Sequence, residues 1–141
     1  MTIDEIGKSL PNGFHDAYIL AISLDYVNES ATFRFQIDLS SFVKGVEVDI
    51  PSRVGELKLT GLLYCVIEPP SGYSFTKEYI PSDDKLWIVS DSSDFSKLKN
   101  CPTFPDPLPD GSFRHWFWSS SHNNIVYVAA MNASFDWIDG E

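Results

Sequence analysis

The stretch of this sequence with the most unusual composition is Arg114-His115-Trp116-Phe117-Trp118, whose arginine and histidine could bind a partner or act in catalysis. In a β-strand, alternate side chains point to opposite faces, so Arg114, Trp116 and Trp118 would share one face. A guanidinium beside two indoles could form a cation–π surface that recognises a partner. The alternative is that one face belongs to the core and a proline-rich loop covers the other, and the high average burial of tryptophan favours it. His115 is then a core or boundary histidine.

His15 and Asp16 form a second pair, because adjacent imidazole and carboxylate groups suit acid/base catalysis or metal binding. Neighbours in a strand point to opposite faces, so these two side chains can share a ligand only if the chain turns there. Their types favour a structural role, such as capping a turn or bonding to a neighbouring loop. The functional alternative is a pocket for a small ligand, or for hydrolysis, that His15 and Asp16 line together with Tyr64 and Arg114.

Metal-binding and catalytic motifs do not occur. The three histidines include no H-x-x-H pair and the two cysteines no C-x-x-C pair, so zinc is not expected. Asp83, Asp84, Asp91 and Asp94 lack the spacing of a calcium-binding EF-hand and are expected to form a solvated rim. The nucleophile motif G-x-S-x-G and the phosphate-binding motif G-x-x-x-x-G-K-[ST] are also missing. We therefore assign no catalytic residue, no metal and no cofactor, and favour a protein without enzymatic activity.

Charge and length restrict the function classes. The 141 residues fit one domain, 1–141, with a core of its own. Acidic residues number 20 against 10 basic ones, for a formal net charge of −10. Nucleic acid and anionic membranes require positive charge on the protein, so neither is an expected partner. The acidity serves solubility or suits a basic protein partner.

The N-terminal segment resembles no signal peptide, because it lacks the basic region and the apolar region of one. No apolar run approaches the length of a membrane span. Cys65 lies in an apolar strand pattern and Cys101 in the proline-rich segment, so a disulfide is not expected and free thiols suit the cytosol. We therefore expect a cytoplasmic protein.

The elements that position these residues follow from the spacing of apolar side chains. Segment 14–39 alternates as one long β-hairpin. Its first strand carries one apolar row, formed by Tyr18, Leu20, Ile22, Leu24 and Tyr26. The second strand carries another, formed by Ala31, Phe33, Phe35, Ile37 and Leu39. A turn with Val27 opposite Ser30 sets the register, so that Ile22 faces Phe35 and both rows lie on one side of the sheet.

The rest of the chain is also rich in β-structure. Thr2 is a predicted N-cap of a short helix. Further strands are predicted within 46–50, 56–67, 86–89, 112–118 and 125–131, with a bulge or kink at Gly61 and a passage of strand 56–67 from the rim to the centre of the sheet. Prolines make segment 101–111 a surface crossover. The pattern predicts a mostly-β fold: a β-sandwich or a strongly curved antiparallel sheet of seven or eight strands, with one short N-terminal helix.

Several short motifs in this order resemble a family of small uncharacterised bacterial β-rich proteins. They are Gly13-Phe14-His15-Asp16-Ala17, Leu24-Asp25-Tyr26, Leu59-Thr60-Gly61-Leu62, Ile67-Glu68-Pro69-Pro70 and Gly111-Ser112-Phe113-Arg114-His115-Trp116-Phe117. The resemblance implies a bacterial cytosolic setting and supplies no catalytic residue. By analogy, some small bacterial β-rich proteins of this kind look like immunity proteins of toxin systems.

These observations favour a non-enzymatic protein that binds a basic protein partner, such as a toxin. The candidate ligand or partner residues are His15, Asp16, Tyr64, Arg114, His115, Trp116 and Trp118. The alternative from another class is the small-ligand protein or hydrolase described above. A third alternative is a homodimer that uses the aromatic strands.

Overall fold

The computed structural model describes residues 1–43, 46–48, 50–68, 86–99, 101–119 and 124–138. The aromatic segment 73–84, for which the sequence predicts mostly loop, lies outside them, and so does His122. The elements are α1 (Ile3–Ser9), β1 (Tyr18–Asp25), β2 (Ser30–Ile37), β3 (Ser41–Val43), β4 (Val46–Val48), β5 (Arg53–Ile67), β6 (Leu86–Ser92), the 3-10 helix η1 (Phe95–Lys97), β7 (Phe113–Ser119) and β8 (Asn124–Trp137). The mostly-β fold with one short N-terminal helix is confirmed.

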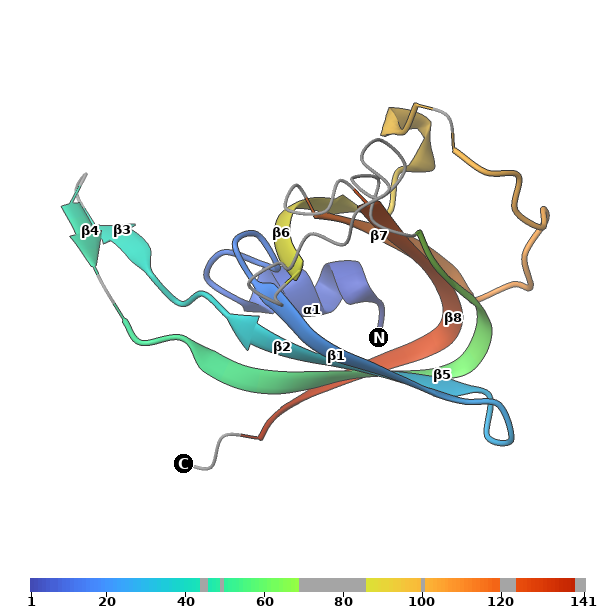
Figure 1. Cartoon of the computed structure of the whole chain (residues 1–141), viewed down its shortest axis with the longest axis horizontal. Helices are drawn as coiled ribbons and strands as arrows, with labels where there is room; N and C mark the ends of the chain where they lie inside the picture. Colours follow the sequence, from blue (N-terminus) through green and yellow to red (C-terminus); the bar gives the residue numbers. More distant parts are fainter. Residues whose placement is uncertain (44–45, 49, 69–85, 100, 120–123, 139–141) are drawn as a thin grey trace, which may run out of the picture.

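Six strands form an antiparallel sheet that closes on itself in the order β1-β2-β5-β8-β7-β6, as Figure 1 shows. The strongly curved sheet is thus correct, and the two-sheet sandwich is not formed. Among the described residues, the seam between β1 and β6 consists of two pairs, Tyr18 with Trp87 and Ile19 with Leu86. Strands β3 and β4 form a separate two-stranded arm that projects from the barrel (Figure 1).

The first hairpin has a different register from the predicted one. Asp25 pairs with Ser30 and Ile22 with Phe33, so the pairing is shifted by two residues. The cause is the turn, which contains four residues between the paired ends because the Asp25 carboxylate accepts hydrogen bonds from the backbone N–H groups of Val27 and Asn28, both at 3.0 Å. Such a side-chain cap stabilises a longer loop than the predicted two-residue turn.

A β-bulge changes which face of β1 lies inside. Ile19 pairs with Phe35 and Ala21 with Arg34, which leaves Leu20 as the extra residue. An extra residue reverses the alternation, so Ile19 is buried while Leu20 is only partly covered. The predicted inward row of β1 is therefore wrong on the N-terminal side of the bulge. The predicted row of β2 is correct, because Phe33, Phe35 and the other inward residues of that strand are buried.

Strand β5 passes from the centre of the molecule to its rim, which reverses the predicted direction. Leu57 and Leu59 in its first half are fully buried, whereas Val66 and Ile67 near its end are exposed. The predicted irregularity at Gly61 is present: its φ is +60°, and the pairing with β8 shifts between Leu62 and Tyr64. The bulge lets a long strand bend around the barrel.

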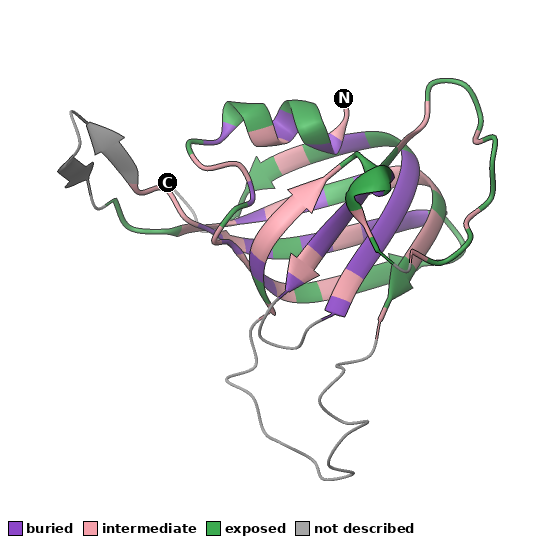
Figure 2. Ribbon diagram, turned by 90° about the horizontal axis from the view of Figure 1, so that it is seen from above, coloured by how far each residue is buried: buried purple, intermediate pink, exposed green. Residues whose placement is uncertain are grey.

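The core fills the barrel and extends beneath α1, as the burial colours of Figure 2 show. Thr2 caps this helix as predicted, and with the Glu5 side chain it forms a capping box. Ile3, Ile6 and Phe14 pack against the buried side chains of the sheet. In the described part of the chain, no helix has the length and hydropathy needed to span a membrane.

A second, smaller apolar cluster lies outside the barrel. It consists of Phe95, Trp116 and Tyr127, with Tyr64, Leu98, Cys101, Phe104, Trp118 and Ile125 packed against them. Phe95 comes from η1 and Phe104 from the proline-rich segment 101–111. These two segments therefore cover the outer face of β7 and β8.

Candidate functional site

The chain turns sharply at His15 and Asp16, immediately before β1. Asp16 has a left-handed backbone with φ of +64°, and its N–H donates to the carbonyl of Ile88 at 2.9 Å. The turn brings the side chains together, with His15 Nδ1 at 3.1 Å from Asp16 Oδ2. Left-handed backbone is costly for a residue other than glycine and is frequent at functional sites. The two neighbours thus share one surface, which a regular strand would not allow.

Two residues of β6, across the seam from β1, hold the corner at Asp16 in place. The indole Nε1 of Trp87 donates to Asp16 Oδ1 at 3.1 Å, and the Ile88 N–H donates to the carbonyl of Ala17 at 2.8 Å. These bonds join β6 to the corner that precedes β1. Asp16 thus bonds to a neighbouring segment of the chain.

Asp16 also lines a cleft of about 400 Å³. Its lining residues are Asp16, Tyr18, Gln36, Asp38, Ile50, Pro51, Ser52 and Trp87. We call it the Asp16 cleft. The cleft brings together β1, the end of β2, the segment before β5 and the start of β6, so its walls come from four separate parts of the chain.

The chemistry of the Asp16 cleft suits a cation. Asp16 and Asp38 contribute carboxylates, Tyr18 and Trp87 contribute aromatic rings, and the described lining residues include neither lysine nor arginine. Asp38 is itself held in place, since its Oδ1 accepts from the N–H and the hydroxyl of Ser40 at 2.9 and 2.7 Å. Carboxylates bind ammonium and guanidinium groups through charge-assisted hydrogen bonds, and aromatic faces attract the same groups.

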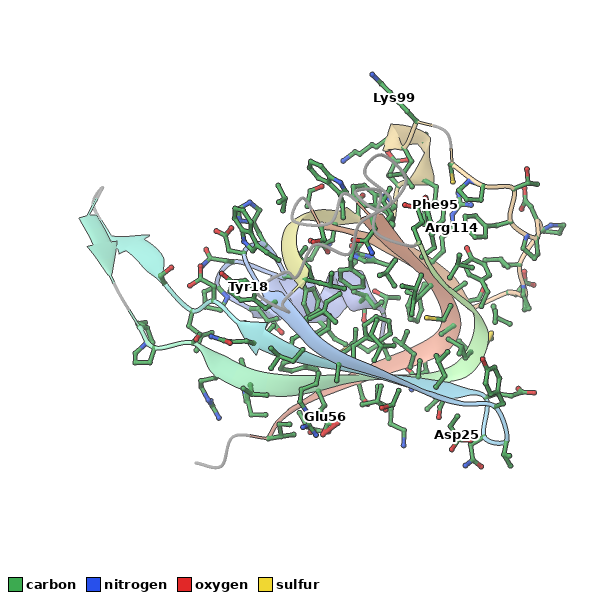
Figure 3. All side chains as sticks on the ribbon, in the orientation of Figure 1. Tyr18, Asp25, Glu56, Phe95, Lys99 and Arg114 are labelled. Carbon is green, nitrogen blue, oxygen red and sulfur yellow. The ribbon has the colours of Figure 1, made fainter. Side chains whose placement is uncertain are left out.

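The Arg114, Trp116 and Trp118 row is covered only in part, since Arg114 is exposed and Trp118 is half-buried. Trp116 is buried and donates from its indole Nε1 to the carbonyl of Asp94 at 3.0 Å. The Arg114 guanidinium lies 4.5 Å from the centre of the Phe95 ring, as their positions in Figure 3 illustrate. The cation–π contact is therefore made with phenylalanine from η1. These contacts agree with the structural interpretation, in which a loop covers the row.

His115 is buried and links three elements. Only 1% of its side chain is exposed, and its Nε2 lies 2.6 Å from Asp91 Oδ2 in β6. Its Nδ1 lies 3.8 Å from Asp4 Oδ1 in α1 and has no hydrogen-bond partner. The nearby Ser93 hydroxyl donates its hydrogen bond to Asp4 Oδ2 at 2.8 Å. The arrangement ties α1 and β6 to β7.

Tyr64 belongs to the outer cluster. Its ring stacks on Phe104 with centroids 4.7 Å apart, and burial raises the pKa of its hydroxyl. Tyr64, Asp16 and Arg114 line three different cavities. These cavities thus keep Asp16, Tyr64 and Arg114 apart and do not support a single pocket shared with His15.

Two residues of the Asp16 cleft, Asp38 and Trp87, were not predicted from the sequence. In the sequence, Asp38 is only the polar residue near the end of an alternating strand pattern, and Trp87 is only one residue of a short apolar strand pattern. Trp87 meets Asp16 through the seam between β1 and β6, which joins segments about 70 residues apart, whereas Asp38 follows β2, the hairpin partner of β1. Among the described residues, no group of three or more His, Cys, Asp or Glu side chains is arranged to hold a metal ion.

The fold and the cleft define a mostly-β barrel protein with a preformed acidic and aromatic surface site. No family model matches the sequence, and no curated protein matches it significantly. Among solved structures, the chain resembles the crystal structure of an uncharacterized protein from Neisseria gonorrhoeae, with 12% sequence identity and a TM-score of 0.48. The match covers 86% of this chain and 91% of that chain. The bacterial family with the G-F-H-D-A motif remains a prediction from the sequence.

Proposed function

We propose that this protein is a non-enzymatic binding protein for a basic protein partner. The observation that carries the proposal is the Asp16 cleft, where two carboxylates and two aromatic rings converge without a basic side chain among the described lining residues. The formal net charge of −10 supports it, because a negative surface accelerates association with a positive partner.

An immunity-like role is the biological setting that we propose by analogy. An immunity protein acts by binding its toxin, so it needs a complementary surface and no catalytic residues. A small acidic β-protein that binds a basic toxin fits this requirement. Cytoplasmic localisation belongs to the same proposal.

The hydrolase or small-ligand alternative receives less support. It depended on a pocket shared by His15, Asp16, Tyr64 and Arg114, and Asp16, Tyr64 and Arg114 line three different cavities. The homodimer alternative, which uses the aromatic strands, receives less support because Trp116 of β7 is buried within the chain.

Affinity capture from a cell extract of the native host, followed by calorimetry with the purified partner, tests the proposal. We expect a basic protein that is retained at low salt and released at high salt, because salt screens attraction between exposed charges. The variant Asp16→Asn/Asp38→Asn should weaken its affinity by about tenfold or more, which corresponds to roughly 1.4 kcal/mol.

Asp106→Asn/Asp110→Asn is the matched control. It removes the same charge from two exposed aspartates of the proline-rich segment, which do not line the Asp16 cleft. Equal losses in both double variants would show that net charge alone determines binding and would exclude the cleft. Capture of no basic partner at low salt would overturn the proposed function as a whole.

A further inference from the structure

The tip of the β1–β2 hairpin exposes large apolar side chains. Tyr26 is 86% exposed and Val27 is 90% exposed, and Leu24 beside them is 37% exposed. Single exposed apolar residues are ordinary on a protein surface, but adjacent ones on a projecting turn form a contact surface. Figure 3 shows Asp25 at this tip, at the opposite end of β1 from Tyr18 and the Asp16 cleft.

Hydrogen bonds hold this tip in one conformation. The carboxylate of Asp25 accepts from the Val27 and Asn28 N–H groups through Oδ1 and from the Asn28 amide through Oδ2 at 2.7 Å. The bonds from Asn28 and Val27 lower the pKa of Asp25, so the capping group stays ionised at neutral pH. The Leu62 N–H donates to the carbonyl of Glu29 at 2.8 Å and fastens the turn to β5. A turn fixed in this way loses little conformational entropy on binding.

A groove of about 190 Å³ adjoins the exposed side chains. Its lining residues are Leu24, Asp25, Tyr26, Glu29, Ser30, Leu62, Leu63, Tyr64 and Cys65. The β5 bulge forms one wall, and it leaves Leu63 exposed by 38%. The lining thus combines apolar side chains with the carboxylates of Asp25 and Glu29.

We propose that this surface, the hairpin-tip groove, is a docking site for a segment of a partner protein that carries aliphatic or aromatic side chains beside lysine or arginine. The apolar side chains of that segment would cover Tyr26, Val27 and Leu63, and its cations would face Asp25 and Glu29. The two charged residues that line the groove are both acidic, while Lys58 is close enough to contribute to the lowered pKa of Asp25. Charge complementarity therefore selects a basic occupant.

This inference rests on the proposed function for the charge of the partner and adds a second contact surface to it. In the proposed function, the Asp16 cleft receives the cationic groups of the partner. The hairpin-tip groove adds an apolar anchor of the kind that dominates binding energy in protein interfaces.

Synthetic peptides provide the probe, with binding followed through the backbone amide resonances of the full-length protein. One peptide alternates lysine with leucine and phenylalanine, a second replaces the apolar residues by serine, and a third replaces lysine by glutamate. We expect the first peptide alone to bind and to shift the amides of residues 24–30 and 62–65. Binding by none of the peptides at about millimolar concentration, equal binding by the third peptide, or shifts confined to other residues would each overturn the proposal.

The variant Tyr26→Ser/Val27→Ser tests the apolar anchor, and both positions are exposed enough for the fold to tolerate the change. It should weaken binding of the lysine–leucine peptide by about tenfold or more. Ile138→Ser is the matched control, since Ile138 is also exposed but follows the opposite end of the sheet. The control should retain affinity within about twofold. An equal loss in both variants would contradict the assignment.

Two further outcomes separate this inference from its competitors. If the captured basic partner loses affinity in Asp16→Asn/Asp38→Asn but not in Tyr26→Ser/Val27→Ser, the proposed function stands and the hairpin-tip groove is excluded. If sedimentation shows self-association that Tyr26→Ser/Val27→Ser abolishes, a second copy of this chain is the occupant and the proposal is wrong.

Discussion

Asp16 carries two functions at the scale of a single residue: its backbone forms the corner before β1, and its carboxylate lines the cleft. The left-handed φ of +64° is unfavourable for most side chains. The hydrogen bond from Trp87 and the backbone bond to Ile88 offset that cost. The local structure therefore explains the aspartate of the G-F-H-D-A motif without reference to a binding partner.

Substitutions of Asp16 separate the backbone from the side chain. Asp16→Gly and Asp16→Ala both lose the bond to Trp87, but glycine adopts a positive φ without strain. We expect the free energy of unfolding of Asp16→Ala, measured by urea denaturation, to be about 1–2 kcal/mol lower than that of Asp16→Gly. Equal stability of the two variants would show that the corner relaxes.

The pairing of His115 with Asp91 makes a second prediction at this scale. His115→Leu leaves the carboxylate of Asp91 without its partner in a site that is largely shielded from water. Loss of a hydrogen bond to a charged group should lower the free energy of unfolding by about 1–3 kcal/mol. A double-mutant cycle with Asp91→Asn should give a favourable coupling energy between the two residues. Simple additivity of the two single changes would argue that the pair contributes no stability.

At the scale of elements, bulges determine which side chains reach the two candidate surfaces. The extra residue Leu20 in β1 brings Ile19 into the core, and the extra residue Leu63 in β5 exposes a leucine beside the hairpin tip. Both irregularities bend long strands so that the sheet can close.

Gly61 tests the bulge in β5. Its φ is +60°, and a Cβ at this position would lie 2.8 Å from Cβ and Cγ of Met131. Gly61→Ala should therefore cost about 2 kcal/mol or more, from backbone strain and from the collision with β8. Met131→Ala in the same chain removes the contact with Cγ but keeps the contact with Cβ, so it should recover only part of the steric cost. Full recovery in the double variant, measured by thermal unfolding, would show that the backbone is not strained.

At the scale of the whole molecule, the burial of one thiol and two tyrosine hydroxyls should make the free energy of unfolding depend on pH in the alkaline range. Burial raises the pKa of the Cys65 thiol to about 11, and it also raises the pKa of the Tyr64 hydroxyl. The pKa of the Tyr127 hydroxyl is raised by burial first and by its hydrogen bond to Glu68 second. Since these groups keep their protons longer in the folded chain, the unfolded chain ionises first as the pH rises. Stability is therefore constant below the unfolded values and falls above about pH 9.

Denaturation at pH 8 and at about pH 10.5 measures this loss. Tyr127→Phe removes one of the three titrating hydroxyl or thiol groups, so its stability should fall less steeply with pH. A slope identical to that of the parent protein would exclude Tyr127 as a contributor. The same burial should make Cys65 react slowly with maleimide at neutral pH, because the thiolate is the reactive form.

The sequence alone determined the mostly-β fold, the N-terminal helix with its Thr2 cap, the inward row of β2, the strand that contains the Arg114 row and the irregularity at Gly61. These features depend on alternation, turn residues and capping, which act between neighbours in the chain. A four-residue turn and a bulge displaced the predicted register of the first hairpin, because an aspartate cap and one extra residue leave little trace in an apolar pattern.

Only the tertiary structure decided that the sheet closes, that Trp87 bonds to Asp16, and that Asp38 joins them in one cleft. It also separated Tyr64 and Arg114 from Asp16, and left Tyr26 and Val27 exposed at the hairpin tip. Each of these outcomes depends on strand pairs that are distant in sequence. Local periodicity defines the two faces of a strand, but the pairing of distant strands decides which neighbour each face meets.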